Sequence, residues 1–228
     1  MKKFITASVL SLILTNILAA QGQEIPKKAL CAVCVLRGET EKENVKAHAK
    51  FDGETYYFCS KGCEKEFLAD PKAYTKPVFP RPAPNMAVTT LDGKDATLKD
   101  FLGKVVLLDF WATWCKPCLK IMPELQALHA ANADNGFTVV GVSIDEGKNS
   151  LKKIRKFLGK LNISYPIFWD SKATPAWHTF KVKAIPATFL IDRDGQIVGQ
   201  WAGVIDHKEI ESATAKILSP VDAPNENE

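Results

Sequence analysis

Residues 107–118 read LLDFWATWCKPC, an apolar run that leads into two cysteines separated by two residues. A continuous apolar run of this kind is typical of a buried central strand. After the cysteines, apolar residues recur at intervals of three and indicate a helix, namely Leu119, Met122, Leu125 and Leu128. The stretch therefore predicts a buried strand, a turn and a helix, with Cys115 at the helix start.

This placement favours redox chemistry at the two cysteines. The unpaired N–H groups and the positive dipole end of a helix N-terminus stabilise a thiolate, and Lys116 adds a nearby cation. The thiolate is the attacking species in disulfide exchange, and Cys118 is one turn along, close enough to resolve a mixed disulfide. Half of a zinc site is a weaker alternative, because this half of the chain has no other cysteine. An inert disulfide is also weaker, because so short a loop constrains the unfolded chain little.

The sequence around this motif predicts one mixed sheet between helices. Asp92-Gly93 and Asp194-Gly195 are dipeptides typical of tight hairpin turns. Strand and helix patterns alternate between and after these turns, with strands expected in 136–145 and 165–170, helices in 151–161 and 207–218, and a hairpin over 185–203. This order predicts an α/β sandwich.

These features resemble the thioredoxin superfamily, and specifically its exported TlpA/ResA-like branch, over residues 84–218. Besides 107–118, the resemblance rests on Pro123 in the helix, on the loop Ile185-Pro186-Ala187-Thr188, and on an inserted helical segment between Asp145 and Tyr165. It implies an α/β, thioredoxin-like fold and a thiol–disulfide oxidoreductase that needs no redox cofactor beyond its own cysteines.

The resemblance also assigns roles to individual residues. It implies that Cys115 is the nucleophile and Cys118 the resolving thiol. It implies that Pro186 is cis and shapes the substrate groove, and that Ile185 offers backbone hydrogen bonds to an extended substrate. Trp114 is expected beside the cysteines as part of the substrate-binding surface.

Asp109 stands six residues before Cys115, where thioredoxins carry a buried acid that relays the Cys118 proton. A buried carboxylate has a raised pKa, which suits general-base work near neutrality; a structural Asp at a strand end is the alternative. The sequence departs from its branch at Ile121, three residues after Cys118, where relatives often carry a glutamate. This departure puts in doubt the branch's substrate apocytochrome c.

A second cluster, CAVC at 31–34 and CSKGC at 59–63, has metal-like spacing. Four thiolates suit zinc or copper(I), so the predicted ligands are Cys31, Cys34, Cys59 and Cys63. A unit of about 45 residues cannot bury much core, so a metal or disulfides must hold it. Two disulfides in one of three pairings are the alternative.

This second unit resembles the YHS/TRASH family of small metal-associated domains over residues 29–75. The resemblance rests on the four cysteines and on the segment Tyr56-Tyr57-Phe58, followed by Phe67, Pro71 and Tyr74. Such domains accompany proteins that handle copper and heavy metals. We therefore expect a small, Cys-rich α+β N-terminal domain.

The N-terminus has the layout of a secretory signal peptide over 1–22, with two lysines, an apolar stretch and small residues. An uncleaved membrane anchor is the alternative, although the apolar run is short for a span. The sequence thus predicts an exported protein, periplasmic or otherwise extracytoplasmic and soluble after cleavage. Such a compartment is usually oxidising, so a thiol that must stay reduced there needs a reductant.

The expected organisation after the signal is a Cys-rich domain at 23–75, a proline-rich linker at 76–85, a thioredoxin-like domain at 86–218 and a disordered tail at 219–228. The net charge of +4, which falls to +2 without Lys2 and Lys3 (4 − 2), is too weak to indicate nucleic acid.

Two functions follow from this organisation. The first is an exported reductase of protein disulfides, recharged by a membrane thiol donor, with apocytochrome c or metalloprotein thiols as candidate substrates. The second is a metal-binding protein or metallochaperone whose thioredoxin-like domain keeps ligand cysteines reduced. Activity on a protein disulfide such as insulin separates the two.

Overall fold

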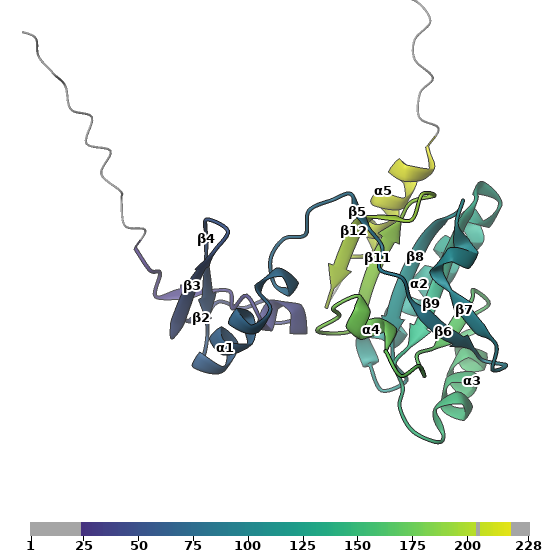
Figure 1. The fold of residues 1–228 in the computed structure, drawn as a ribbon, viewed down its shortest axis with the longest axis horizontal. Helices are drawn as coiled ribbons and strands as arrows, with labels where there is room; N and C mark the ends of the chain where they lie inside the picture. Colours follow the sequence, from purple (N-terminus) through teal and green to yellow (C-terminus); the bar gives the residue numbers. More distant parts are fainter. Residues whose placement is uncertain (1–23, 204–205, 220–228) are drawn as a thin grey trace, which may run out of the picture.

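The computed structural model of the chain describes residues 24–203 and 206–219. The predicted signal segment at 1–22 and nearly all of the predicted tail lie outside these residues. Figure 1 shows a small N-terminal unit joined by one connecting segment to a larger sheet-and-helix unit. In the described part of the chain, no helix is both long and apolar enough to cross a membrane.

The larger unit is built on one eight-stranded mixed sheet with the order β5-β12-β11-β8-β9-β10-β6-β7. Strands β8, β9 and β10 are mutually parallel, while β11 runs antiparallel to both of its neighbours. The strands are β5 (Arg81–Pro82), β6 (Ala87–Thr90), β7 (Asp95–Thr97), β8 (Val105–Trp111), β9 (Phe137–Ser143), β10 (Ile167–Trp169), β11 (Ala187–Ile191) and β12 (Gln196–Ala202).

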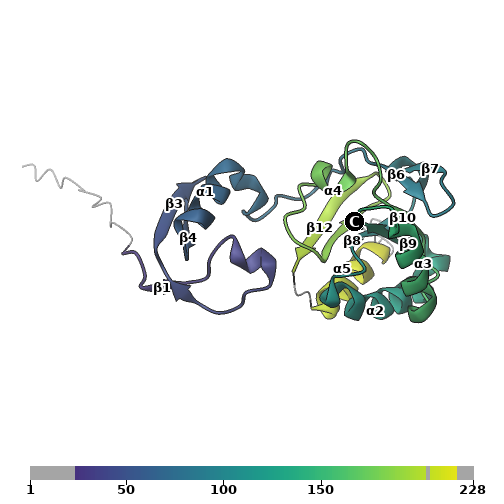
Figure 2. The same ribbon diagram turned by 90° about the horizontal axis from the view of Figure 1, so that it is seen from below.

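Helices cover both faces of this sheet. Helices α2 (Lys116–Asn132), α3 (Ser150–Leu161) and α5 (His207–Leu218) lie on one face, and α4 (Ala176–Thr179) lies on the other, as Figure 2 shows. Every residue of β8 is buried, because this strand lies in the middle of the sheet with side chains on both faces. The elements expected around the cysteines are therefore present, including the inserted helix α3.

The predicted hairpin turns are confirmed. Gly93 and Gly195 both have positive φ, at 87° and 78°, a backbone conformation that glycine adopts at little cost. The segment predicted as a linker is only partly a connector, because β5 pairs with β12 within it. Proline cannot donate a ladder hydrogen bond, so a proline-containing strand belongs at a sheet edge, and β5 is an edge strand.

The small unit consists of two antiparallel two-stranded sheets, β1-β2 and β3-β4, and the α-helix α1. It contains β1 (Lys28–Ala29), a 3-10 turn η1 (Cys34–Arg37), β2 (Glu43–Asn44), β3 (Ala47–Phe51), β4 (Glu54–Phe58), α1 (Lys61–Ala69) and η2 (Pro71–Ala73). Its core is centred on Phe67, whose ring packs against four other aromatic rings, those of Phe51, Tyr56, Phe58 and Tyr74. Ser60 caps α1 by accepting the backbone N–H of Cys63.

Candidate redox site and metal centre

The two cysteines of the WCKPC motif lie where strand β8 gives way to helix α2. Cys115 is the N-cap of α2, and its Sγ accepts the backbone N–H of Cys118 at 3.2 Å. The two are joined by a disulfide. Cys115 is 5% exposed and Cys118 is fully buried, so an incoming sulfur can reach only the first of them.

The turn before Cys115 is held by a buried carboxylate that the sequence did not single out. Asp145 accepts the backbone N–H of Thr113 at 2.8 Å and its hydroxyl at 2.6 Å. Ser143 donates a third hydrogen bond to the same carboxylate. The only local signal for this role was a position just past a buried strand. Beside this turn, Trp114 is 65% exposed while Trp111 is buried.

The proline loop closes the other side of the site. The Ile185–Pro186 peptide bond is cis. Ile185 packs against the core cluster that contains Cys115 and Cys118. The carbonyl of Pro186 accepts the backbone N–H of Gly203 at 2.9 Å. The structure thus brings Cys115, Cys118, Ile185 and Pro186 together, and adds Gly203 as a further backbone element of the same edge.

Asp109 lies beneath this site on the face of β8 that packs against α2. Side chains two apart on a strand share a face, and Leu107 and Trp111 belong to the cluster that contains the cysteines. Asp109 is fully buried and receives one hydrogen bond, from the hydroxyl of Thr188 at 3.3 Å. Its other oxygen has no partner among the described residues. Burial raises the pKa of Asp109 to about 7, and the Thr188 hydrogen bond opposes that shift.

The four cysteines of the small domain converge from three elements. Cys31 and Cys34 flank the start of η1, Cys59 follows β4, and Cys63 lies in the first turn of α1. The Sγ atoms of Cys34, Cys59 and Cys63 are 3.6, 3.7 and 3.8 Å apart. All four Sγ atoms lie within 4.8 Å of one another, and none is in a disulfide.

These separations fit a tetrahedral thiolate site. Four sulfurs bonded at about 2.3 Å to one zinc ion stand roughly 3.8 Å apart at the corners of a tetrahedron. A disulfide instead needs a sulfur–sulfur distance of about 2.05 Å, so each of the three pairings would require the cysteines to move. The donor set also suits copper(I), which prefers sulfur ligands.

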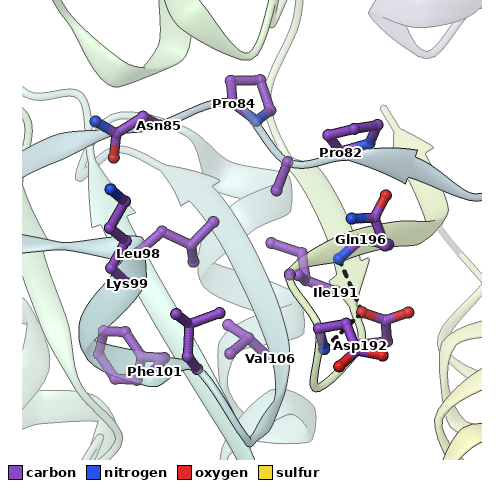
Figure 3. Close-up of a pocket in the computed structure, with 14 residues that line it drawn as sticks. Pro82, Pro84, Asn85, Leu98, Lys99, Phe101, Val106, Ile191, Asp192 and Gln196 are labelled. Atoms are coloured by element: carbon purple, nitrogen blue, oxygen red, sulfur yellow. Dashed lines mark hydrogen bonds between the residues drawn. The ribbon is translucent and has the colours of Figure 1, made fainter.

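A separate pocket of about 270 Å³ lies at the opposite end of the sheet. Its walls include Val106 at the start of β8 and Ile191 at the end of β11, together with Leu98 and Phe101, and Figure 3 shows these side chains around it. Because β8 runs from this pocket towards Trp111, the pocket is remote from the cysteines. It takes no part in the redox site.

Comparisons with known proteins agree with this geometry. The model of the AhpC/TSA family matches residues 80–200, and the model of the YHS domain matches residues 38–78. Thiol-disulfide oxidoreductase ResA of Bacillus anthracis is 37% identical over 135 residues, which cover 59% of this chain and 76% of that protein. Thioredoxin-like protein YneN of Bacillus subtilis (strain 168) is 37% identical over 129 residues, covering 57% and 74% respectively.

A solved structure is similar over the same part of the chain. A Chlorobium tepidum protein assigned as a thiol:disulfide interchange protein DsbE is 31% identical, with a TM-score of 0.57, over 63% of this chain and 99% of that one. Fold, cysteine turn and relatives together define a thioredoxin-like thiol–disulfide oxidoreductase preceded by a YHS domain. The chain belongs to the AhpC/TSA family. The predicted fold class and enzyme class are thereby confirmed.

The raised pKa of Asp109 predicts opposite effects of Asp109→Asn on stability and on rate. The unfolded carboxyl ionises near pH 4, whereas the folded one holds its proton to about pH 7. The free energy of unfolding should therefore fall as pH rises between these values, by roughly 4 kcal/mol for a shift of this size. Asp109→Asn should remove that fall and raise the free energy of unfolding at pH 8. Urea unfolding at pH 5 and pH 8 measures both.

Under the predicted role of Asp109 as acceptor of the Cys118 proton, Asp109→Asn should slow release of a mixed disulfide by Cys118 by roughly 100-fold or more. Stopped-flow kinetics of a single turnover measures this step. Asp145→Asn is the matched control, since Asp145 is also buried but accepts three hydrogen bonds. It should lower the free energy of unfolding by about 1–3 kcal/mol. A gain in stability for Asp145→Asn, or none at pH 8 for Asp109→Asn, would contradict this account.

Proposed function

We propose that this protein is an exported reductase of protein disulfides, with Cys115 as the nucleophile and Cys118 as the resolving thiol. The observation that carries the proposal is the asymmetry of the pair. Cys115 caps α2, accepts an N–H at its sulfur and is 5% exposed, whereas Cys118 is fully buried. A sulfur stabilised by a helix N-terminus is the better attacking group.

The surroundings support this assignment of steps. Trp114 and the loop at Ile185 and Pro186 form the surface on which an extended substrate would lie, with its disulfide sulfur in front of Cys115. After that attack, Cys118 must lose a proton before it can displace the substrate. The Asp109 carboxylate, on the same buried face and with a pKa of about 7, is the proposed acceptor of that proton.

Export and the electron donor belong to the same proposal. The layout of residues 1–22 is that of a signal peptide, and in an oxidising compartment the dithiol must be regenerated by a membrane thiol donor. Ile121 stands where related reductases often carry a glutamate, and it packs against the same cluster as Cys118. We therefore propose protein disulfides in general as substrates and do not extend the proposal to apocytochrome c.

The nucleophile assignment predicts selective alkylation. In the reduced chain at pH 7, Cys115 should react with iodoacetamide faster than Cys118, because only Cys115 is accessible and stabilised as thiolate. Peptide mass spectrometry over a time course measures both rates. Cys115→Ser should abolish insulin reduction, and equal alkylation of the two cysteines would refute the assignment.

The direction of the reaction predicts a low redox potential. Lys116 contributes one charge that water and salt screen, and Pro117 has no N–H to offer the Cys115 sulfur. We expect a potential nearer about −270 mV than about −120 mV, the two ends of the thioredoxin-like range. Equilibration with glutathione measures it. A value above roughly −170 mV would favour an enzyme that introduces disulfides.

We also propose that the four cysteines of the YHS domain hold one zinc or copper(I) ion. The supporting observation is the separation of 3.6–3.8 Å between three of the sulfurs, which suits metal–thiolate bonds and is too long for disulfides. A bound ion would hold η1, β4 and α1 together in a domain whose core is small.

The proposed metal site predicts how many metal ions the chain binds, and it predicts that binding depends on the four YHS-domain cysteines and not on Cys115 and Cys118. The full reduced chain should bind one metal ion, because four thiolates complete a tetrahedral shell. Metal analysis after gel filtration measures this. Cys59→Ser should lower the bound metal sharply, whereas Cys118→Ser, a matched change in the other cysteine pair, should leave it unchanged. A metal-free chain with two disulfides within residues 31–63 after anaerobic purification would rule the metal site out.

A further inference from the structure

The redox site and the end of β12 lie at one edge of the sheet. Strands β8 and β12 both run antiparallel to β11, so their carboxyl ends point the same way. Ala187 of β11 stands opposite both Phe110 and Ala202. Gly203 is therefore level with Trp111, two strand spacings or about 10 Å away. Cys115 follows four residues after Trp111.

The YHS domain touches that edge through the segment that follows Cys34. A β-carbon built on Gly203 would lie 3.2 Å from the carbonyl oxygen of Leu36 and 3.4 Å from the amide nitrogen of Gly38. The N–H of Gly203 is bonded to the carbonyl of Pro186. In Figure 2 the purple segment that contains η1 lies beside the end of β12. The segment that directly follows the candidate metal ligand Cys34 thus borders the proline loop of the redox site.

Charged groups of the two domains also meet near the proline loop. The Asp70 carboxylate lies 3.6 Å from the Nζ of Lys181 and 3.4 Å from that of Lys183, just before the proline loop. The Lys183 ammonium also stands 5.8 Å from the centre of the Tyr74 ring. The Asp70 side chain is 28% exposed in both ion pairs. These pairs hold the small domain beside the segment that leads into the proline loop.

The cluster cysteines are themselves disulfide-forming groups. Three of their sulfurs are less than 4 Å apart, so a modest movement joins two of them when no metal holds them. Such a disulfide removes two of the four ligands and abolishes tetrahedral binding. In an oxidising compartment a cluster of this kind needs a reductant, and the tether supplies one at high effective concentration.

We propose that a disulfide within the Cys31, Cys34, Cys59 and Cys63 cluster is an intramolecular substrate of the Cys115–Cys118 dithiol. The Cys115 thiolate attacks one sulfur of the cluster disulfide, forming a mixed disulfide and releasing the other sulfur as a thiolate. Cys118 then loses its proton, and its sulfur attacks the Cys115 sulfur. This breaks the mixed disulfide and releases the cluster sulfur as a thiolate. The cluster gains two electrons and returns to four thiols, and Cys115–Cys118 becomes the disulfide, to be reduced again by an external dithiol.

This inference rests on the proposed reductase function and is tested with the full chain. The metal-free protein is fully oxidised and then given a limiting dithiol, and thiols in the 31–63 peptides are followed by alkylation and mass spectrometry. Reduction of the cluster should be roughly ten-fold or more faster in the wild type than in the Cys115→Ser/Cys118→Ser variant, because tethering raises the effective concentration. With the dithiol concentration held constant, its first-order rate constant should not change when the protein is diluted.

Two further variants sharpen the result. Cys118→Ala, reduced and then allowed to react under oxidising conditions, should accumulate a disulfide between Cys115 and a cluster cysteine of the same chain. Asp70→Lys places like charge against Lys181 and Lys183, so it should slow cluster reduction and leave insulin reduction unchanged. Glu41→Lys, the same charge change at an exposed position of the same domain, is the control and should change neither rate.

The outcomes separate this inference from the reductase proposal. In one outcome, the cluster is reduced at the same rate in the wild type and in the double serine variant while the wild type still reduces insulin. That result overturns only the proposal that the cluster disulfide is an intramolecular substrate. Equal rates with no insulin reduction overturn both proposals. A first-order rate constant that falls in proportion to protein dilution at constant dithiol concentration shows exchange between chains and also overturns the intramolecular step.

Discussion

Strand β8 lies between β11 and β9 with all seven of its residues buried, and the desolvation of this strand governs the site. Burying its apolar side chains on both faces drives the packing of the helices over the sheet. The same burial removes water from Asp109 and so raises its pKa. The strand then ends at Trp111, where the chain must turn, and that turn carries Cys115 to the start of α2.

Local patterns in the sequence predicted those elements well, because the strand, the turn and the helix are each specified by neighbouring residues. The partners of the site are specified differently. Thr113 and Asp145 are 32 residues apart in the chain, and Asp109 and Thr188 are 79 apart. No local pattern names the partner of Asp109 or of Thr113, so only the register of β8 against β9 and β11 reveals which groups meet.

The cysteine cluster illustrates the same limit. Its spacing indicated four ligands, but spacing alone left metal and disulfides open, since both use cysteines that a hairpin brings together. The separation between sulfurs depends on how α1 leaves β4. Ser60 caps α1 one residue after Cys59, which turns Cys63 back towards Cys34 at 3.8 Å. That distance is a property of the capped turn and favours a shared ion.

The prolines between the domains predicted a connector, and their placement also fixes where that connector joins the sheet. Because proline lacks an N–H, the chain at Arg81–Pro82 can join the sheet only at its edge, and it pairs there with the start of β12. Arg81 adds a hydrogen bond to Gln200 on that strand. The end of β12 leads to Gly203, which lies against the backbone of Leu36 and Gly38 in the small domain. The connector and the contact thus lie at the two ends of one strand of seven residues, about 23 Å long, so the strand that receives the connector also ends beside the segment that follows Cys34.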